Sequence, residues 1–310
     1  MGRFVVSRIA QGVVVLFGVT LAAFALIHLA PGDPAKLILG LRATPASVAE
    51  LRHELGLDKP LPDQFVDFVT HAARLDFGQS AVHRESVGSL IGGRLGASLL
   101  LIVYGSVLSV VIAVPLGVIS ALKRNRLADH STRVVTMVAF AMPPFWLGLL
   151  LLLVFSVNLG WLPSSGYGEA VAGRLESLTL PAIVLALGLV PLLLRTLRSS
   201  MIEALSSEYV ESARALGFRE RRVVVKHALR TSLVSMVTVL GLNVAYVLGG
   251  IVVIENVFVI PGVGSLLVDA AVTRDYPVVQ AIALIFAVIV VVVNITTDIT
   301  YARLDPRVRL

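Results

Sequence analysis

Residues 97–122 read ASLLLIVYGSVLSVVIAVPLGVISAL, a run of 26 residues without a charged side chain. About 20 apolar residues in a helix are enough to cross the hydrocarbon core of a bilayer. Five further apolar stretches occupy residues 9–29, 134–159, 178–194, 233–254 and 280–301. The sequence therefore predicts an all-α integral membrane protein with six transmembrane helices.

The composition supports this prediction and excludes several chemistries. Apolar residues make up 56% of the 310 residues and charged residues only 15%, whereas about a quarter of a soluble domain is charged. The chain has no cysteine, which excludes disulfides and thiolate sites. None of its four lysines lies in a phosphate-binding P-loop, and His53-Glu54 lacks the second histidine of a zinc-protease helix. We expect no enzyme activity, metal site or cofactor in this chain.

The basic residues predict the orientation of the six helices, because loops rich in Lys and Arg stay in the cytoplasm. The two tails and the second and fourth loops hold 17 Lys and Arg in 66 residues, against 9 in 110 residues for the other three loops. We predict a multi-pass protein of the cytoplasmic (inner) membrane with both termini inside. A cleaved signal peptide at residues 9–29 is less favoured, because the apolar run is too long. The net charge of +6 is then explained by basic cytoplasmic loops that contact anionic lipid, rather than by binding to nucleic acid.

The predicted helices divide the chain into three parts: residues 1–29, an external loop at 30–96, and a core at 97–310. In the external loop, Ser47 and Glu50 fit a capping box and Gly56 fits a helix stop. A second short helix is predicted from the helical spacing of five apolar residues, Phe65, Phe68, Val69, Ala72 and Leu75. These helices pack on the ends of the spans or meet an external partner, and packing is favoured.

The cytoplasmic loop at residues 195–232 is the most informative segment. It is predicted to form two helices, at residues 200–216 and 219–231, with Gly217 at the left-handed position that ends the first. A partner that binds such a rigid pair of helices can move the fourth and fifth spans attached to it. A helix lying on an anionic membrane surface, with Arg219, Arg221 and Arg222 near the lipid, is an equal alternative.

This loop also resembles a known family. Glu211-Ser212-Ala213, three residues, Gly217, nine residues and His227-Ala228-Leu229 are similar to the EAA loop of permease subunits of ABC importers. The departures from the motif, Ser212, His227 and Arg230, resemble the B-type permeases for dipeptides and oligopeptides. Further segments similar to that branch lie along the whole chain: Pro31-Gly32-Asp33-Pro34, Leu55-Gly56-Leu57-Asp58 with Pro60 and Gln64, Asp76-Phe77-Gly78-Gln79-Ser80, Glu255 with Phe258, Pro261-Gly262-Val263-Gly264, and Arg274-Asp275-Tyr276-Pro277.

The resemblance implies a type I ABC importer permease fold and a division of labour between subunits. The loop would couple the chain to a partner ATPase through Glu211, Ser212, Ala213, Arg214 and Gly217. Ala213 would let the two backbones approach, and Glu211 would pair with basic groups. The implied partners are a homologous permease, two ATP-binding cassette subunits that hold ATP and Mg, and an extracytoplasmic solute-binding protein.

Polar and turn residues near the spans give weaker predictions. Asn243 and Tyr246 share a face of the fifth span and are predicted to line the translocation pathway, with an interhelical hydrogen bond as the alternative for Asn243. After that span, Pro261 and Gly262 fit a turn with positive φ at the glycine. This outer segment is predicted to act as a gate or to contact the binding protein. The residues predicted for this role are Glu255, Pro261, Gly262 and Asp275. Simple packing of the segment is the alternative.

The predicted function is therefore that of a permease that imports dipeptides or oligopeptides by alternating access, with ATP hydrolysis in its partners. A secondary transporter driven by an ion gradient is the alternative from another class, but it needs ion ligands near the midplane that the sequence does not offer. Within the ABC interpretation, the branch also includes importers of nickel complexes, glutathione and oligosaccharides.

Overall fold

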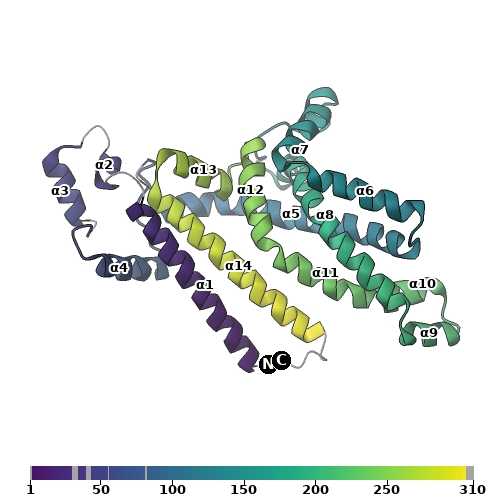
Figure 1. Cartoon of the computed structure of the whole chain (residues 1–310). Helices are drawn as coiled ribbons and strands as arrows, with labels where there is room; N and C mark the ends of the chain where they lie inside the picture. Colours follow the sequence, from purple (N-terminus) through teal and green to yellow (C-terminus); the bar gives the residue numbers. More distant parts are fainter. Residues whose placement is uncertain (1, 30–33, 40–42, 55, 81, 305–310) are drawn as a thin grey trace. The chain divides into compact units, whose positions relative to one another are not determined.

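The computed structural model describes residues 2–29, 34–39, 43–54, 56–80 and 82–304, and nearly all of them are helical (Figure 1). The chain divides into two compact units. One comprises residues 1–96 with 262–292, and the other comprises residues 97–261 with 293–310. The three-part division made from the sequence stays a prediction. Four residues that carry the family resemblance lie outside the described residues: Pro31, Gly32, Asp33 and Leu55.

The first unit contains the helices of the N-terminal third: α1 (Gly2–Leu29), α2 (Pro34–Leu39), α3 (Pro45–Glu54) and α4 (Leu61–Ala73). Here α4 lies against α1, with the ring of Phe65 5.9 Å from Phe17 and 5.3 Å from Phe24. The predicted packing of this helix on a span is therefore confirmed. A second core in the unit joins α13 (Val263–Thr273) to parts of α5 (Val87–Leu122) and α14 (Tyr276–Leu304), through Val87, Ile91, Val263, Leu266, Ala270, Val278, Ala281 and Ile282.

Two details of the external loop differ from the prediction. The capping box lies three residues before the predicted one, because Thr44 and Ser47 exchange hydrogen bonds between side chain and backbone N–H. Ser47 is thus inside the first turn of α3, and Glu50 is inside the helix. Leu75 lies beyond the end of α4 at φ +59° and is 75% exposed, so it does not continue the apolar face. The stop at Gly56 is confirmed by its φ of +65°.

Five helical segments are long and apolar enough to cross a membrane: Val6–Ala25, Val87–Leu122, Val171–Leu205, Glu220–Leu242 and Tyr276–Thr300. A bent pair is apolar enough to be a sixth when its two halves are taken as one span: α6 (Leu127–Ala141), then α7 (Pro144–Leu151) with the π-helix η2 (Leu152–Asn158). The two halves are inclined by 103° at Met142 and Pro143. The predicted third span, residues 134–159, is therefore not one straight helix, because Pro143 lacks the N–H that would continue the first half.

In the second unit, α5 and α8 (Val171–Leu205) pack in the same direction. Near one end the Tyr104 hydroxyl lies 3.2 Å from that of Thr179. Further along, Gly105 faces Leu185 and Gly117 faces Leu197, so the contact advances by 12 residues on both helices. The chain between two parallel helices must return to its starting side. The bent pair makes this return, which agrees with the six predicted crossings.

The predicted fifth span, residues 233–254, is interrupted at Asn243. Here α11 (Arg230–Leu242) ends and α12 (Val244–Val257) begins. The Asn243 side chain donates a hydrogen bond to the carbonyl of Val239 at 2.7 Å and so competes with the helix ladder. Both helices pack against α8. The fourth span is also longer than predicted, since α8 continues 11 residues past Leu194.

We predict that Gly105→Val destabilises the second unit, because a Cβ at this position would lie 2.4 Å from Cδ2 of Leu185. Overpacking of this kind costs about 1–3 kcal/mol. Melting of the purified chain in detergent measures the effect, and adding Leu185→Ala restores part of it. Gly92→Val on the same helix is the matched control, because nothing lies within 4 Å of its Cβ position. Equal melting temperatures for the two single variants contradict the packing.

Candidate functional site

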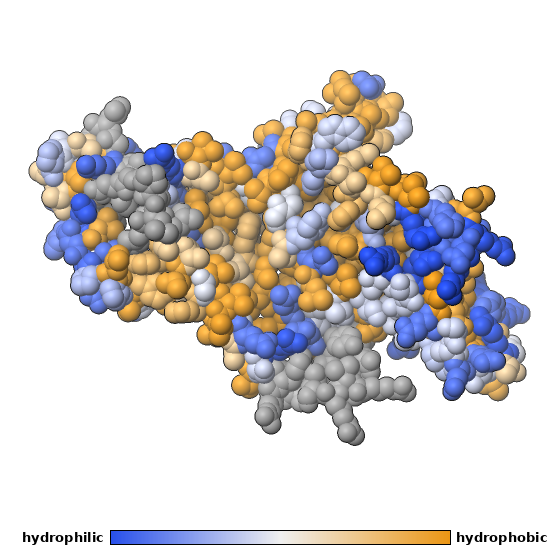
Figure 2. Space-filling model, viewed as in Figure 1, coloured by the Kyte–Doolittle hydropathy of each residue, from blue (hydrophilic) through white to orange (hydrophobic). Residues whose placement is uncertain are grey.

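The predicted coupling segment forms a compact helical elbow, which we define as residues 206–229. It consists of α9 (Glu208–Ala215), a turn at residues 216–219, α10 (Glu220–Arg222) and the π-helix η3 (Val223–Leu229). The single helix predicted at residues 200–216 is wrong. α8 ends at Leu205, where the Ser206 and Ser207 hydroxyls bond to carbonyls of its last turn, and α9 starts afresh. Hydrophilic residues gather at the end of the second unit that carries α9 and α10 (Figure 2).

Gly217 ends α9 in the predicted left-handed conformation, with φ +81°. Its N–H donates to the carbonyl of Arg214 at 2.9 Å, and the N–H of Phe218 donates to that of Ala213 at 3.2 Å. This pair of bonds is a Schellman motif, which satisfies two carbonyls that the helix end leaves open. The turn between the arms of the elbow is thus fixed by hydrogen bonds.

The elbow has a small apolar core of its own, made of Val210, Ala213 and Val223. Ala213 is 5% exposed and faces inward, so its short side chain lets Val223 approach. This differs from the expectation that Ala213 would face a partner backbone. The residue supports the shape of the elbow from inside.

Polar and aromatic contacts tie the two arms together. Arg214 donates from Nε and a terminal nitrogen to the two carboxylate oxygens of Glu220, at 3.1 and 2.8 Å. The hydrogen bonds that Arg214 donates to Glu220 raise the pKa of the Arg214 guanidinium above its ordinary value. Across the turn, the Phe218 ring lies 4.8 Å from the Arg222 guanidinium and 6.0 Å from the stacked His227 ring. Arg214 therefore stabilises the turn in addition to any contact with a partner.

The outer face of α9 combines acidic and apolar groups. Glu208, Glu211 and Ser212 are exposed, as is Tyr209, while Leu216 at the tip is 77% exposed. Carboxylates in the first turn of a helix also suit its positive end. Of the predicted coupling residues, Glu211 and Ser212 are thus presented outward, whereas Ala213, Arg214 and Gly217 shape the elbow.

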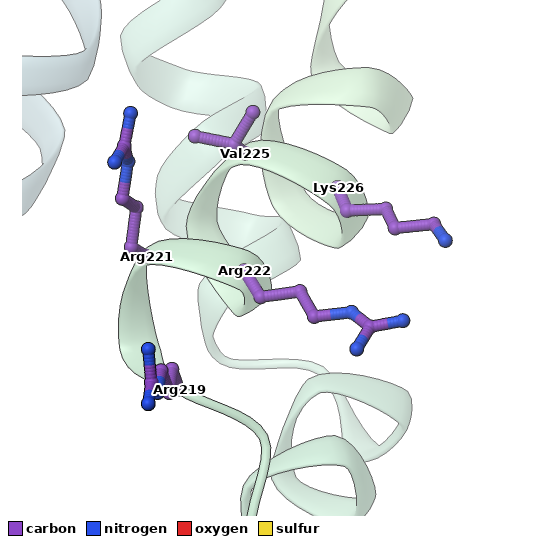
Figure 3. Close-up of a pocket in the computed structure, with 5 residues that line it drawn as sticks. All are labelled: Arg219, Arg221, Arg222, Val225 and Lys226. Atoms are coloured by element: carbon purple, nitrogen blue, oxygen red, sulfur yellow. The ribbon is translucent and has the colours of Figure 1, made fainter.

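The second arm is basic. Arg219, Arg221, Arg222, Val225 and Lys226 line an open groove of about 330 Å³ along α10 and η3 (Figure 3). Arg222 and Lys226 extend to the same side of the helix in the close-up, and Arg221 and Val225 lie on another. These cations occupy the start of the segment that becomes the Glu220–Leu242 span.

The predicted pathway residues lie at the break between α11 and α12. Asn243 is half-buried, and the bond to Val239 is within its own helix rather than between helices. Tyr246 is 46% exposed, and its hydroxyl would lie 3.2 Å from a Cβ added to Gly188 of α8. The Tyr246 hydroxyl thus lies beside α8, and its role in a pathway stays a prediction.

The four outer residues have different environments. Glu255 is fully buried and accepts a hydrogen bond from the Ser98 hydroxyl at 2.6 Å. Asp275 is also buried and accepts one from the Ser80 hydroxyl. Gly262 is the buried N-cap of α13 with φ −107°, so the positive φ predicted for it is wrong; Val259 adopts it instead, at +53°. Pro261 is exposed.

Two polar residues of the second unit were missed from the sequence. Asp129, at the start of α6, is completely buried and bound to Arg198 of α8. The sequence predicts a loop at residues 195–232, whereas Arg198 lies inside α8. The signal available was the amphipathic continuation of the fourth span, with Leu197 and Met201 spaced to share a face with Leu194.

Comparisons with known proteins agree along the whole chain. Residues 113–310 match the model of the family described as binding-protein-dependent transport system inner membrane component, and residues 1–102 match its N-terminal companion. The oligopeptide transport system permease protein AppB of Bacillus subtilis is 38% identical over 314 residues, 99% of both chains. The glutathione transport system permease protein GsiC of Escherichia coli K12 is 39% identical over 309 residues, 100% of this chain and 99% of that one.

A structural comparison supports the same fold. A chain of the inward-facing MetNI methionine ABC transporter aligns with a TM-score of 0.58 and 16% identity, covering 70% of this chain and 96% of that one. The predicted all-α permease fold is thereby confirmed. With both family models matched in sequence order, the chain belongs to the binding-protein-dependent transport system inner membrane components, the permease subunits of ABC importers.

Proposed function

We propose that this permease imports peptides, including very short ones. The support is the whole-length similarity to proteins named as an oligopeptide permease and a glutathione permease, since glutathione is itself a tripeptide. The elbow carries the mechanistic part of the proposal. It is a compact, hydrogen-bonded structure that projects from the end of a long helix. A chain without a P-loop of its own needs such a surface on which an ATPase subunit can bind.

The proposed assembly pairs this chain with a homologous permease, two ATP-binding cassette subunits and an extracytoplasmic solute-binding protein. ATP and Mg are held by the cassette subunits. We propose that both termini and the elbow lie in the cytoplasm, which the density of Lys and Arg supports. The basic groove on the second arm then contacts anionic lipid headgroups at the inner surface.

The proposed coupling follows from the shape of the elbow. The outer face of α9 binds in the ATPase subunit, where Glu211 meets basic groups and Leu216 meets an apolar surface. Closure of the ATPase pair moves α9, and the bonded turn at Gly217 passes this movement to α11. The permease pair then alternates between inward-open and outward-open states.

The membrane and outer residues have proposed roles that fit their environments. Tyr246 and Asn243 line the pathway beside α8. Asn243 also makes the break between α11 and α12. On the outer side, exposed Pro261 contacts the binding protein. Buried Glu255, Asp275 and Gly262 support that outer segment from beneath instead of touching the partner.

Uptake by vesicles that contain the assembled transporter tests the substrate class. We expect labelled dipeptides to pentapeptides to accumulate with ATP and the binding protein, and glutathione to compete with them. Accumulation of a nickel complex or an oligosaccharide without any peptide uptake contradicts the proposal.

We predict that Gly217→Pro leaves membrane insertion intact but abolishes transport and uncouples ATP hydrolysis. Proline cannot adopt φ +81° and removes the N–H that bonds to Arg214. Gly160→Pro is the control, since Gly160 also has positive φ (+62°) and open space around it, but lies outside the elbow. Uptake and ATP hydrolysis are measured on the same vesicles, and unchanged peptide uptake by Gly217→Pro counts against the mechanism.

We predict that Glu211→Arg weakens binding of the ATPase subunit about tenfold or more, because a charge-assisted hydrogen bond becomes a repulsion. Copurification of the ATPase with the tagged permease measures this. Glu176→Arg, an exposed carboxylate at the other end of α8, is the matched control. If both variants retain the ATPase equally, Glu211 has no part in docking.

A further inference from the structure

A buried carboxylate joins three helices at the end of α8 that leads to the elbow. Asp129 has no exposed surface, and its oxygens accept hydrogen bonds from Nε and a terminal nitrogen of Arg198 at 2.8 and 2.7 Å. The Ser120 hydroxyl of α5 donates at 2.5 Å, and Arg133 of α6 approaches to 3.3 Å. One side chain is therefore bonded to α5, α6 and α8.

The same carboxylate also fixes the turn between α5 and α6. The backbone N–H of Asn125 donates to it at 2.9 Å, and Asn125 has the left-handed φ of +60°. A residue other than glycine adopts this conformation at a cost, which local hydrogen bonds offset. Asp129 thus holds the α5–α6 turn in one shape while it holds Arg198.

Arg198 lies close to the elbow along a single stiff element. From Arg198 to the end of α8 at Leu205 is seven residues, about 10 Å of helix. Met201 and Ala204, on the intervening turns, are buried, so this end of the helix is packed and not frayed. A displacement of α9 therefore reaches Arg198 along one continuous, packed helix.

The form of the contact decides what it can transmit. Apolar contacts are not directional, so they hold two helices together without fixing the shape of a turn beyond them. A guanidinium that makes two parallel bonds to a carboxylate fixes distance and direction together. The remaining bonds of Asp129, itself part of α6, go to Ser120 of α5, to Asn125 in the turn and to Arg133 of its own helix, so a pull on Arg198 acts on the α5–α6 turn.

We propose that Asp129 is a positioning residue for energy coupling: through Arg198 it makes the α5–α6 turn follow the end of α8 when the partner ATPase moves the elbow. This inference rests on the proposed docking of α9. It assigns no contact between Asp129 and the substrate or the ATPase. The transmission of movement and the stability of the fold are measured separately, the first as the import ratio and the second as the melting temperature.

The test replaces the ion pair by apolar residues of similar size, Asp129→Leu with Arg198→Met. Replacement of a buried ion pair by well-packed apolar residues is often neutral or stabilising, whereas loss of one partner leaves a buried charge. We expect the pair variant to fold and to keep its bound ATPase, with a lower melting temperature because the Ser120 hydroxyl and the Asn125 N–H lose their acceptor. Peptide molecules imported per ATP hydrolysed should fall about tenfold, within the usual range of coupling between sites.

Two further variants complete the test. Lys59→Met with Asp67→Leu removes an ion pair outside the second unit and is expected to leave the import ratio unchanged. Arg198→Lys keeps the charge but loses the two-bond geometry, so it should lower the import ratio without lowering the melting temperature. This variant also decides the matter if the apolar pair does not fold.

The outcomes separate this inference from the proposed function. A wild-type import ratio in the folded apolar pair, or in Arg198→Lys, overturns the role of Asp129 and leaves docking of α9 intact. Failure of the unmodified permease to bind any ATPase removes the proposed function instead. A lower import ratio in the Lys59 and Asp67 control as well also overturns the specific role, because loss of coupling would then follow removal of any ion pair.

Discussion

The structure depends on one constraint: a chain surrounded by hydrocarbon must satisfy its backbone donors and acceptors internally. Long helices meet this constraint, and the described residues are accordingly almost all helical. Departures from a straight helix occur at Pro143, which has no N–H to donate, and at Asn243, whose side chain adds a donor. At Pro143 the carbonyl accepts from the N–H of Leu147, and at Asn243 the side chain bonds to Val239. The two breaks are thus built from local hydrogen bonds rather than from loops.

Local hydrogen bonds also fix the elbow, the segment that binds the ATPase in the proposed function. Its turn is closed by the Schellman bonds at Gly217, its interior by Val210, Ala213 and Val223, and its flank by Arg214 and Glu220. The exposed side chains of α9 and its tip remain for a partner: Glu208, Tyr209, Glu211, Ser212 and Leu216. The residues of the motif therefore divide into those that stabilise the elbow and those that are exposed to a partner. Through Arg198, the helix that carries the elbow is also bound to α5 and α6.

The sequence predicted the features that depend on nearby residues. The spans followed from uninterrupted apolar runs, and the left-handed turns at Gly56 and Gly217 followed from glycine after an amphipathic stretch. The errors arose where neighbouring positions compete: Thr44 took the cap that was assigned to Ser47, and Val259 took the positive φ assigned to Gly262. Asp129 and Arg198 are 69 residues apart, so no local pattern could pair them.

The glycines of α5 have a mechanical consequence for the transport cycle. Two notches on one helix receive two leucines spaced by the same 12 residues on its neighbour, about 18 Å apart along the axis. Neither leucine can leave its notch by sliding unless the other leaves at the same moment. Both contacts resist sliding at once, so α5 and α8 keep their register along this length, while the α5–α6 turn beyond Gly117 is held by the polar contacts of Asp129.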